Sequence, residues 1–192
     1  MKSYVKIMIG LMMLAVSLPS LAQSKAEKKA IRQQERSIKK QERLLALQEN
    51  HQQILELVQN QTFAIEAHEL VDRYGRRYPV SSNINFVAFE GDEAIVQYGF
   101  NHLIGFNGLG GNTFDGTISS FQFKESKKNG PITVRSQFIS PGLLGASSLT
   151  MNLYDDGRAY ATVTTAFGSR ITYSGFITDL ENSRIYKGIP RI

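Results

Sequence analysis

The chain has 192 residues, a formal net charge of +5 and no cysteine. Without cysteine it forms no disulfide and carries no lipid on a mature N-terminal cysteine, so lipoproteins and disulfide-held small folds are excluded. The length suits one domain with a single hydrophobic core.

The first 22 residues have the pattern of a secretory signal peptide. Lys2 and Lys6 precede the apolar run Ile7–Leu18, and Pro19–Ala22 ends in small residues before a charged segment. This order predicts cleavage after Ala22 and export, with the periplasm as the expected location. The alternative is an uncleaved membrane anchor, but a spanning helix needs about 20 apolar residues and this run is shorter.

A basic amphipathic helix is expected over residues 23–59. The segment contains no glycine or proline from Ser24 to Gln59 and consists largely of strong helix formers. Residues 25–49 hold eight Lys or Arg against four Glu, which leaves residues 50–192 with twelve basic and thirteen acidic side chains. The excess positive charge therefore lies in the helix and not in the domain that follows. Residues 25–49 contain no aromatic side chain, so nucleic acid is not an expected partner.

The two halves of this helix differ in apolar content. The second half is expected to dock on the following domain through a wide apolar face formed by Leu44, Leu47, Ile54, Leu55 and Val58. The first half has only a thin seam of Ile31, Ile38 and Leu45 and is expected to stay in solvent. Two other interpretations stay open, a weak contact of Lys25–Arg43 with an anionic membrane surface and self-association through the seam. The seam spans barely two heptads, so a monomer is expected.

From residue 60 to residue 192 the helical period gives way to alternation with regular turns, which predicts an antiparallel β domain. Turns are indicated at 73–76, 90–92, 127–130, 155–157 and 167–169. The expected apolar strand faces are Phe63/Ile65/Ala67, Ile84/Phe86/Ala88, Ile132/Val134/Phe138, Leu149/Met151/Leu153 and Ala159/Ala161/Val163. The fold class is therefore mainly β, an antiparallel barrel or a sandwich of about eight strands preceded by one long helix.

The longest irregular segment of this domain is rich in glycine and aromatic residues. It is not a phosphate loop, because Gly105–Thr113 is followed by Asp115-Gly116 and a strand and not by a helix N-terminus. Long loops on rigid β scaffolds often carry binding residues. The residues predicted to bind a ligand or protein of the cell envelope are Phe100, His102, Phe106, Leu109 and Phe114.

No catalytic motif is present in the sequence. No serine lies in a G-x-S-x-G context, and the carboxylate pairs at 92–93 and 155–156 fall in tight turns. The protein is therefore expected to be a non-enzymatic binding module with no metal and no cofactor. The alternative is a hydrolase of an envelope polymer that uses His102 with a nearby carboxylate such as Asp115.

Several short motifs resemble one known family. They are Phe63 with Ile65-Glu66-Ala67, Ile84-Asn85-Phe86-Val87, Gln97-Tyr98-Gly99-Phe100, Gly110–Gly116 and Phe121-Gln122-Phe123. Over roughly residues 40 to 180 the chain resembles the domain-of-unknown-function 4251 family. The resemblance implies a small exported protein of Gram-negative bacteria with a signal peptide, a helical lead-in and a β domain. It implies no activity.

Overall fold

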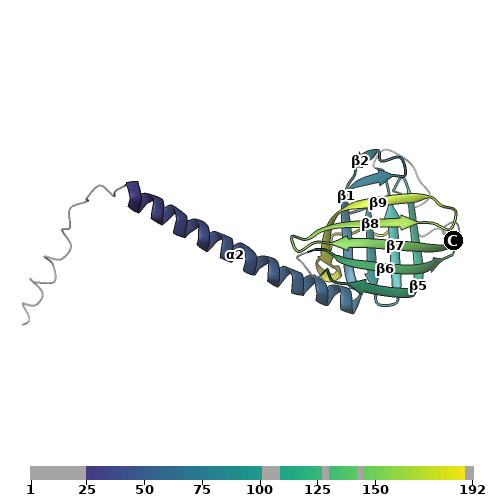
Figure 1. Cartoon of the computed structure of the whole chain (residues 1–192). Helices are drawn as coiled ribbons and strands as arrows, with labels where there is room; N and C mark the ends of the chain where they lie inside the picture. The colour runs from purple at the N-terminus through teal and green to yellow at the C-terminus, as the bar shows by residue number, and fades with distance from the viewer. Residues whose placement is uncertain (1–24, 101–108, 127–129, 142–144, 189–192) are drawn as a thin grey trace, which may run out of the picture. The chain divides into compact units, whose positions relative to one another are not determined.

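The computed structural model describes residues 25–100, 109–126, 130–141 and 145–188, and the side chains from residue 28 onward (Figure 1). These residues form one long helix, nine strands and one short 3₁₀ helix. In chain order the elements are α2 (Lys25–Asn60), β1 (Thr62–Asp72), β2 (Arg77–Pro79), β3 (Phe86–Glu90), β4 (Glu93–Tyr98), β5 (Asn112–Lys124), β6 (Ile132–Ser140), β7 (Gly145–Leu153), β8 (Arg158–Thr164), β9 (Arg170–Asp179) and η1 (Leu180–Asn182).

The sheet closes into a barrel because β1 pairs on both of its edges. Its first half pairs with β3, and almost its whole length pairs with β9, so the antiparallel order β1-β3-β4-β5-β6-β7-β8-β9 returns to β1 (Figure 1). The short strand β2 adds to the far half of β1 as a ninth strand. The register between β1 and β9 shifts between Ala67 and Glu69, a bulge that bends β1. The predicted fold class is confirmed, and of its two forms the barrel is the one present.

Alternation along the strands places one row of side chains inside the barrel. Along β6, Ile132, Val134, Ser136, Phe138 and Ser140 are buried, and every second residue between them is more exposed. The inward faces predicted for β7 and β8 are buried in the same way. In these strands the predicted apolar rows are buried, together with Ser136, Ser140 and Ser147, and the alternate residues are more exposed, so the period of two in the sequence matches the burial pattern.

Strand β3 departs from this rule because both of its faces are buried. Of the predicted face Ile84/Phe86/Ala88, the two residues that belong to the strand, Phe86 and Ala88, point outward, and the barrel interior is lined instead by Val87 and Phe89. The outward face is covered by residues that follow β9, with Leu180 and Ile185 packed against Phe86 and Ala88. The prediction of which face of this strand points into the barrel was therefore wrong. Both faces carry apolar residues, and alternation alone does not show which of the two faces is the inner one.

A buried glutamine holds this C-terminal segment on the barrel. Gln97 of β4 points outward and is fully buried. Its Nε2 donates to the carbonyl oxygens of Ile84 (3.1 Å) and Tyr186 (2.8 Å). Its Oε1 accepts from Thr113 Oγ1 (2.7 Å) and from the Gly188 amide (2.7 Å). All four hydrogen-bonding positions of the amide are thus used, and they join β4 to the turn before β3, to β5 and to the C-terminal segment.

The last turns of α2 close one end of the barrel. Ile54 and Val58 are buried in the same core as Phe63 and Phe89, whose rings stack at a centroid separation of 4.9 Å. Leu55 and Leu57 pack against this core, and Leu47 is half-buried. Docking through Ile54, Leu55 and Val58 is confirmed. The same prediction for Leu44 was wrong, because its side chain is 48% exposed.

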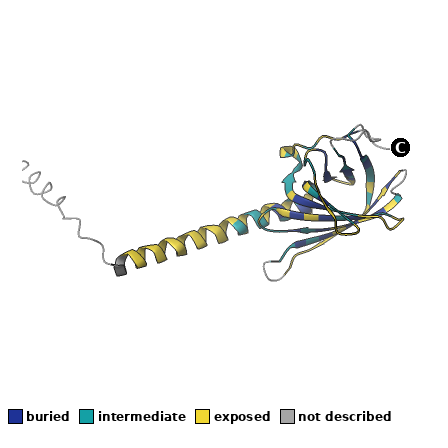
Figure 2. Cartoon of the chain, turned by 90° about the horizontal axis from the view of Figure 1, so that it is seen from above, coloured by how far each residue is buried: buried dark blue, intermediate teal, exposed yellow. Residues whose placement is uncertain are grey.

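Residues up to Leu44 form a separate unit from Leu45–Ile192. From Lys28 to Ala46 every side chain of α2 is exposed, as the yellow part of the helix in Figure 2 shows. Ile31 and Ile38 are 42% and 46% exposed, so no described residue covers the seam. Within the part of the chain that the structure describes, no helix has both the length and the apolarity needed to cross a membrane.

A polar cluster joins α2 to the strand ends that it covers. His51 Nδ1 lies 2.7 Å from Asp155 Oδ1 in the β7–β8 turn, and His51 Nε2 lies 3.4 Å from Glu125 Oε2 beyond β5. Asn50 Nδ2 donates to the carbonyl oxygen of Asp155 at 2.5 Å. The hydrogen bond to Asp155 raises the pKa of His51 above its usual value, and partial burial opposes this only in part.

The stability of the helix docking should therefore depend on pH. Because the pKa of His51 is higher in the folded chain than the unfolded value of about 6.5, its contribution is complete below pH 6.5 and is lost as pH rises through the folded pKa. We expect His51→Gln to lower the free energy of unfolding by about 0.5–1 kcal/mol at pH 6 and to change it little at pH 8.5. Urea titration at both pH values measures this. The exposed His68→Gln is the control, and an equal loss at both pH values would exclude the charged form as the cause.

Candidate functional site

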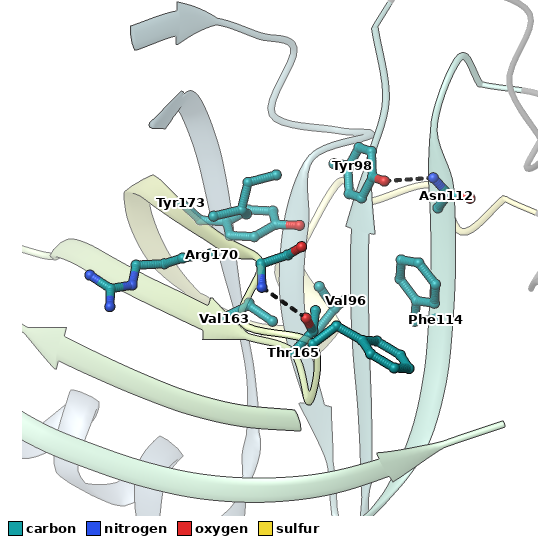
Figure 3. A pocket seen from close by; sticks show the side chains of 11 residues that line it. Val96, Tyr98, Asn112, Phe114, Val163, Thr165, Arg170 and Tyr173 are labelled. Carbon is teal, nitrogen blue, oxygen red and sulfur yellow. Dashed lines mark hydrogen bonds between the residues drawn. The ribbon is translucent and has the colours of Figure 1, made fainter. Parts of the chain in front are cut away.

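A cavity of about 250 Å³ opens at the end of the barrel opposite α2. It lies among strand ends, between the end of β4, the start of β5, and the β8–β9 turn (Figure 3). Its walls are mostly inward side chains of the barrel, namely Val96, Phe114, Val163, Ile171 and Tyr173. Alternation places these side chains inside, and closure of the sheet brings β4 and β5 near β8 and β9 at this end.

One polar atom at the cavity has no partner among the described residues. The Tyr173 side chain is fully buried, and its hydroxyl makes no hydrogen bond there. Burial raises the pKa of Tyr173 well above its usual value, so the hydroxyl stays neutral at physiological pH. Figure 3 shows this hydroxyl pointing toward the space beside Tyr98. A buried hydroxyl without a partner costs about 1–3 kcal/mol, which a ligand group or a water molecule would recover.

A second polar group stands across the cavity from Tyr173. Asn112 Nδ2 donates to Tyr98 Oη at 2.6 Å, which orients the amide (Figure 3). Its other atom, Oδ1, is buried and has no hydrogen-bond partner among the described residues. Asn112 and Tyr173 both line the cavity, one with a carbonyl oxygen that accepts and one with a hydroxyl that both donates and accepts, and each of these two atoms exposes less than 1 Å² of surface.

The rim of the cavity is formed by the β8–β9 turn. Phe167 at this turn is 80% exposed, and Gly168 adopts a φ of 76° that favours glycine. The Ser169 amide donates to Thr165 Oγ1 at 3.2 Å, closing the turn. The guanidinium of Arg170 points away from the cavity in Figure 3, so the charge at this end of the barrel lies outside the apolar walls.

The predicted binding residues are only partly described. Phe114 is buried and lines the cavity. Phe100 and Leu109 are half-buried, with Phe100 packed against the core. His102 and Phe106 lie outside the described residues. Of the three predicted residues that the structure describes, Phe114 lines the cavity, while the lining residues Tyr98, Asn112 and Tyr173 were not predicted as site residues.

Asp115, the carboxylate of the alternative hydrolase, lies on the outer face of β5. It follows the inward Phe114, and its Oδ2 is 2.6 Å from Lys187 Nζ in the C-terminal segment. Alternation directs its side chain away from the barrel cavity. Among the described residues there is also no group of three His, Asp or Glu side chains that could hold a metal ion.

Comparison with known proteins identifies a relative and a family. A crystal structure of a DUF4251 family protein from Bacteroides eggerthii DSM 20697 is similar to this chain, with 28% sequence identity and a TM-score of 0.55. The match covers 72% of this chain and 91% of that one. Curated proteins gave no match. The model of the family described as "Domain of unknown function (DUF4251)" matches residues 46–177, more than half of the sequence, and the chain therefore belongs to the DUF4251 family.

Proposed function

We propose that this protein is an exported binding module that holds a small, neutral and mainly apolar molecule in the cavity of its barrel. The observation that carries the proposal is the pairing of apolar walls with two polar atoms, Tyr173 Oη and Asn112 Oδ1, that have no hydrogen-bond partner in the described part of the chain. Binding sites for small molecules commonly combine a concave apolar surface with a few polar groups that fix orientation.

The size of the cavity limits the ligand. An engineered cavity of about 150 Å³ binds benzene, and most ligand sites begin near 300 Å³. A cavity of about 250 Å³ therefore suits one substituted ring or a short alkyl chain. A carboxylate is disfavoured, because Asn112 Oδ1 would face it as a second acceptor and Arg170 points away. A hydroxyl suits the site, since it can donate to Asn112 Oδ1 and accept from Tyr173.

Binding should depend on the ligand hydroxyl and on Tyr173 together. We expect 4-butylphenol to bind about 3- to 10-fold more tightly than butylbenzene. This ratio of affinities corresponds to the net free energy of one neutral hydrogen bond. In Tyr173→Phe this preference should fall to about twofold or less, while Ile171→Trp should weaken both ligands by filling the cavity. Amide chemical-shift titration of the ¹⁵N-labelled protein measures the affinities and locates the site.

The matched control is Tyr160→Phe, a tyrosine on the outer face of β8 that is 37% exposed. It should leave both affinities unchanged. Shifts that map away from the cavity, or an unchanged preference in Tyr173→Phe, would refute the proposed site.

Export is supported by the basic start, the short apolar run and the small residues before Gln23. Expression of the full chain in a Gram-negative host followed by cell fractionation tests it. The periplasmic fraction should contain a chain that begins at Gln23. Recovery of the uncut chain in the membrane pellet would instead indicate an anchor.

A further inference from the structure

Seven basic side chains lie on one face of α2. They are Lys28, Lys29, Arg32, Arg36, Lys39, Lys40 and Arg43, called here the basic stripe. With 3.6 residues per turn, these positions fall within an arc of about 120°, and with a rise of 1.5 Å per residue they extend over about 23 Å. The two acidic residues of the same stretch, Glu35 and Glu42, lie about 20° and 40° beyond one edge of this arc. Positive charge is therefore concentrated on one side of the helix.

The basic stripe forms no ion pair with a described acidic side chain. All seven side chains are exposed, and none takes part in an ion pair with another described residue. Lys28, Arg32 and Arg36 follow one another at intervals of four, a spacing at which like charges repel and destabilise a helix. The arrangement thus has an electrostatic cost that an anionic partner would remove.

The rest of the helix surface narrows the choice of partner. Ile31 and Ile38 lie roughly 130° from the middle of the stripe, so the stripe and this apolar seam cannot face the same surface. The basic stripe therefore contacts a surface through its charges, without the insertion of apolar side chains into that surface. The stretch holds no aromatic residue on which nucleotide bases could stack. A second copy placed against the stripe would bring seven more positive charges.

We propose that the basic stripe binds the anionic head groups of a lipid bilayer surface. A straight row of exposed Lys and Arg side chains complements a flat surface of diffuse negative charge, and each basic residue near the surface adds an attraction that salt screens. The stripe also lies outside residues 46–177, which the family model matches. Its proximity to residues 1–22 would keep it near the membrane during export.

Vesicle co-sedimentation tests this with residues 23–192, since the apolar run in residues 1–22 could bind lipid by itself. The probe is vesicles of phosphatidylethanolamine and phosphatidylglycerol at roughly 7:3, compared with pure phosphatidylcholine. We expect binding to the anionic vesicles only, at about 50 mM salt, and its loss at about 500 mM. Arg32→Gln, Arg36→Gln and Lys39→Gln in one chain should lower the partition coefficient about 100-fold.

The matched control replaces three exposed basic residues of the barrel unit, Lys124, Arg135 and Arg184, with glutamine. It removes the same charge and should change partitioning by about twofold or less, with circular dichroism confirming that both variants keep their helix. Equal losses in the two triple variants would show a net-charge effect and overturn the proposal. So would equal binding to neutral vesicles, or self-association in sedimentation velocity without binding to any vesicle.

Discussion

Gly175→Ala is expected to prevent the barrel from closing. Gly175 of β9 is paired with Ala67 beside the bulge of β1. A Cβ at this position would overlap the carbonyl group of Glu66 and lie 2.7 Å from Ala67 Cα. Because both obstacles are backbone, they can move only if β1 separates from β9, the pairing that closes the sheet. We expect a loss of more than about 3 kcal/mol in the free energy of unfolding, or an insoluble chain.

The control for this change is Gly168→Ala in the β8–β9 turn. There a Cβ meets nothing within 4 Å, but the φ of 76° is unfavourable for alanine. The expected loss is about 1–2 kcal/mol, the cost of the left-handed conformation alone. Urea unfolding and soluble yield measure both variants. Losses that agree within about 0.5 kcal/mol would show that steric exclusion at Gly175 does not govern closure.

Gln97→Leu is expected to release the C-terminal segment from the outer face of the barrel. The change removes the hydrogen bonds that Gln97 makes with the Gly188 amide and with the carbonyl oxygens of Ile84 and Tyr186. Each such group costs about 1–3 kcal/mol unless it reaches water, so we expect a loss of about 3 kcal/mol that is limited by detachment of residues 183–188. Detachment would expose Phe86 and Ala88.

Hydrogen exchange separates this outcome from general unfolding. The amides of Tyr186 and Gly188 should exchange much faster in Gln97→Leu, while those of β6 and β7 keep most of their protection. Gln122→Leu, at an exposed position of β5, should cost less than about 0.5 kcal/mol. Unchanged exchange at Gly188 would mean that the segment is held by its apolar contacts and not by Gln97.

Alternation in the sequence was sufficient to predict the inward-facing residues of strands that expose their other face to solvent. In β6 and β7 each side chain meets either the core or solvent, so a period of two reveals the inward rows. It failed for β3, where the C-terminal segment buries the outer face and Phe86 looks the same in the sequence as an interior residue. The covering residues 180–188 show no helical or strand periodicity, so no local sequence pattern predicted that they would pack on β3.

For the helix as well, the sequence predicted one part of the structure and not another. Its composition and apolar spacing predicted a helix that docks through Ile54 and Val58. They did not predict where docking begins, because Leu44 has the right spacing but no described residue covers it. Periodicity defines a face of a helix, and contact with another element decides how much of that face is buried.

For the candidate site, too, the sequence predicted one part and the tertiary structure decided the other. The sequence by itself indicated a glycine-rich segment between two strands and placed Phe114 in it, whereas the structure places Phe114 on the inner face of β5. Only the tertiary structure decided that the sheet closes, since the same alternation suits a barrel or a sandwich. Closure depends on the pairing of β1 with β9, about a hundred residues apart in the chain, and it brings Asn112 and Tyr173 to one cavity. Such a pairing depends on the register and twist of all the strands between them, which no local stretch of sequence records.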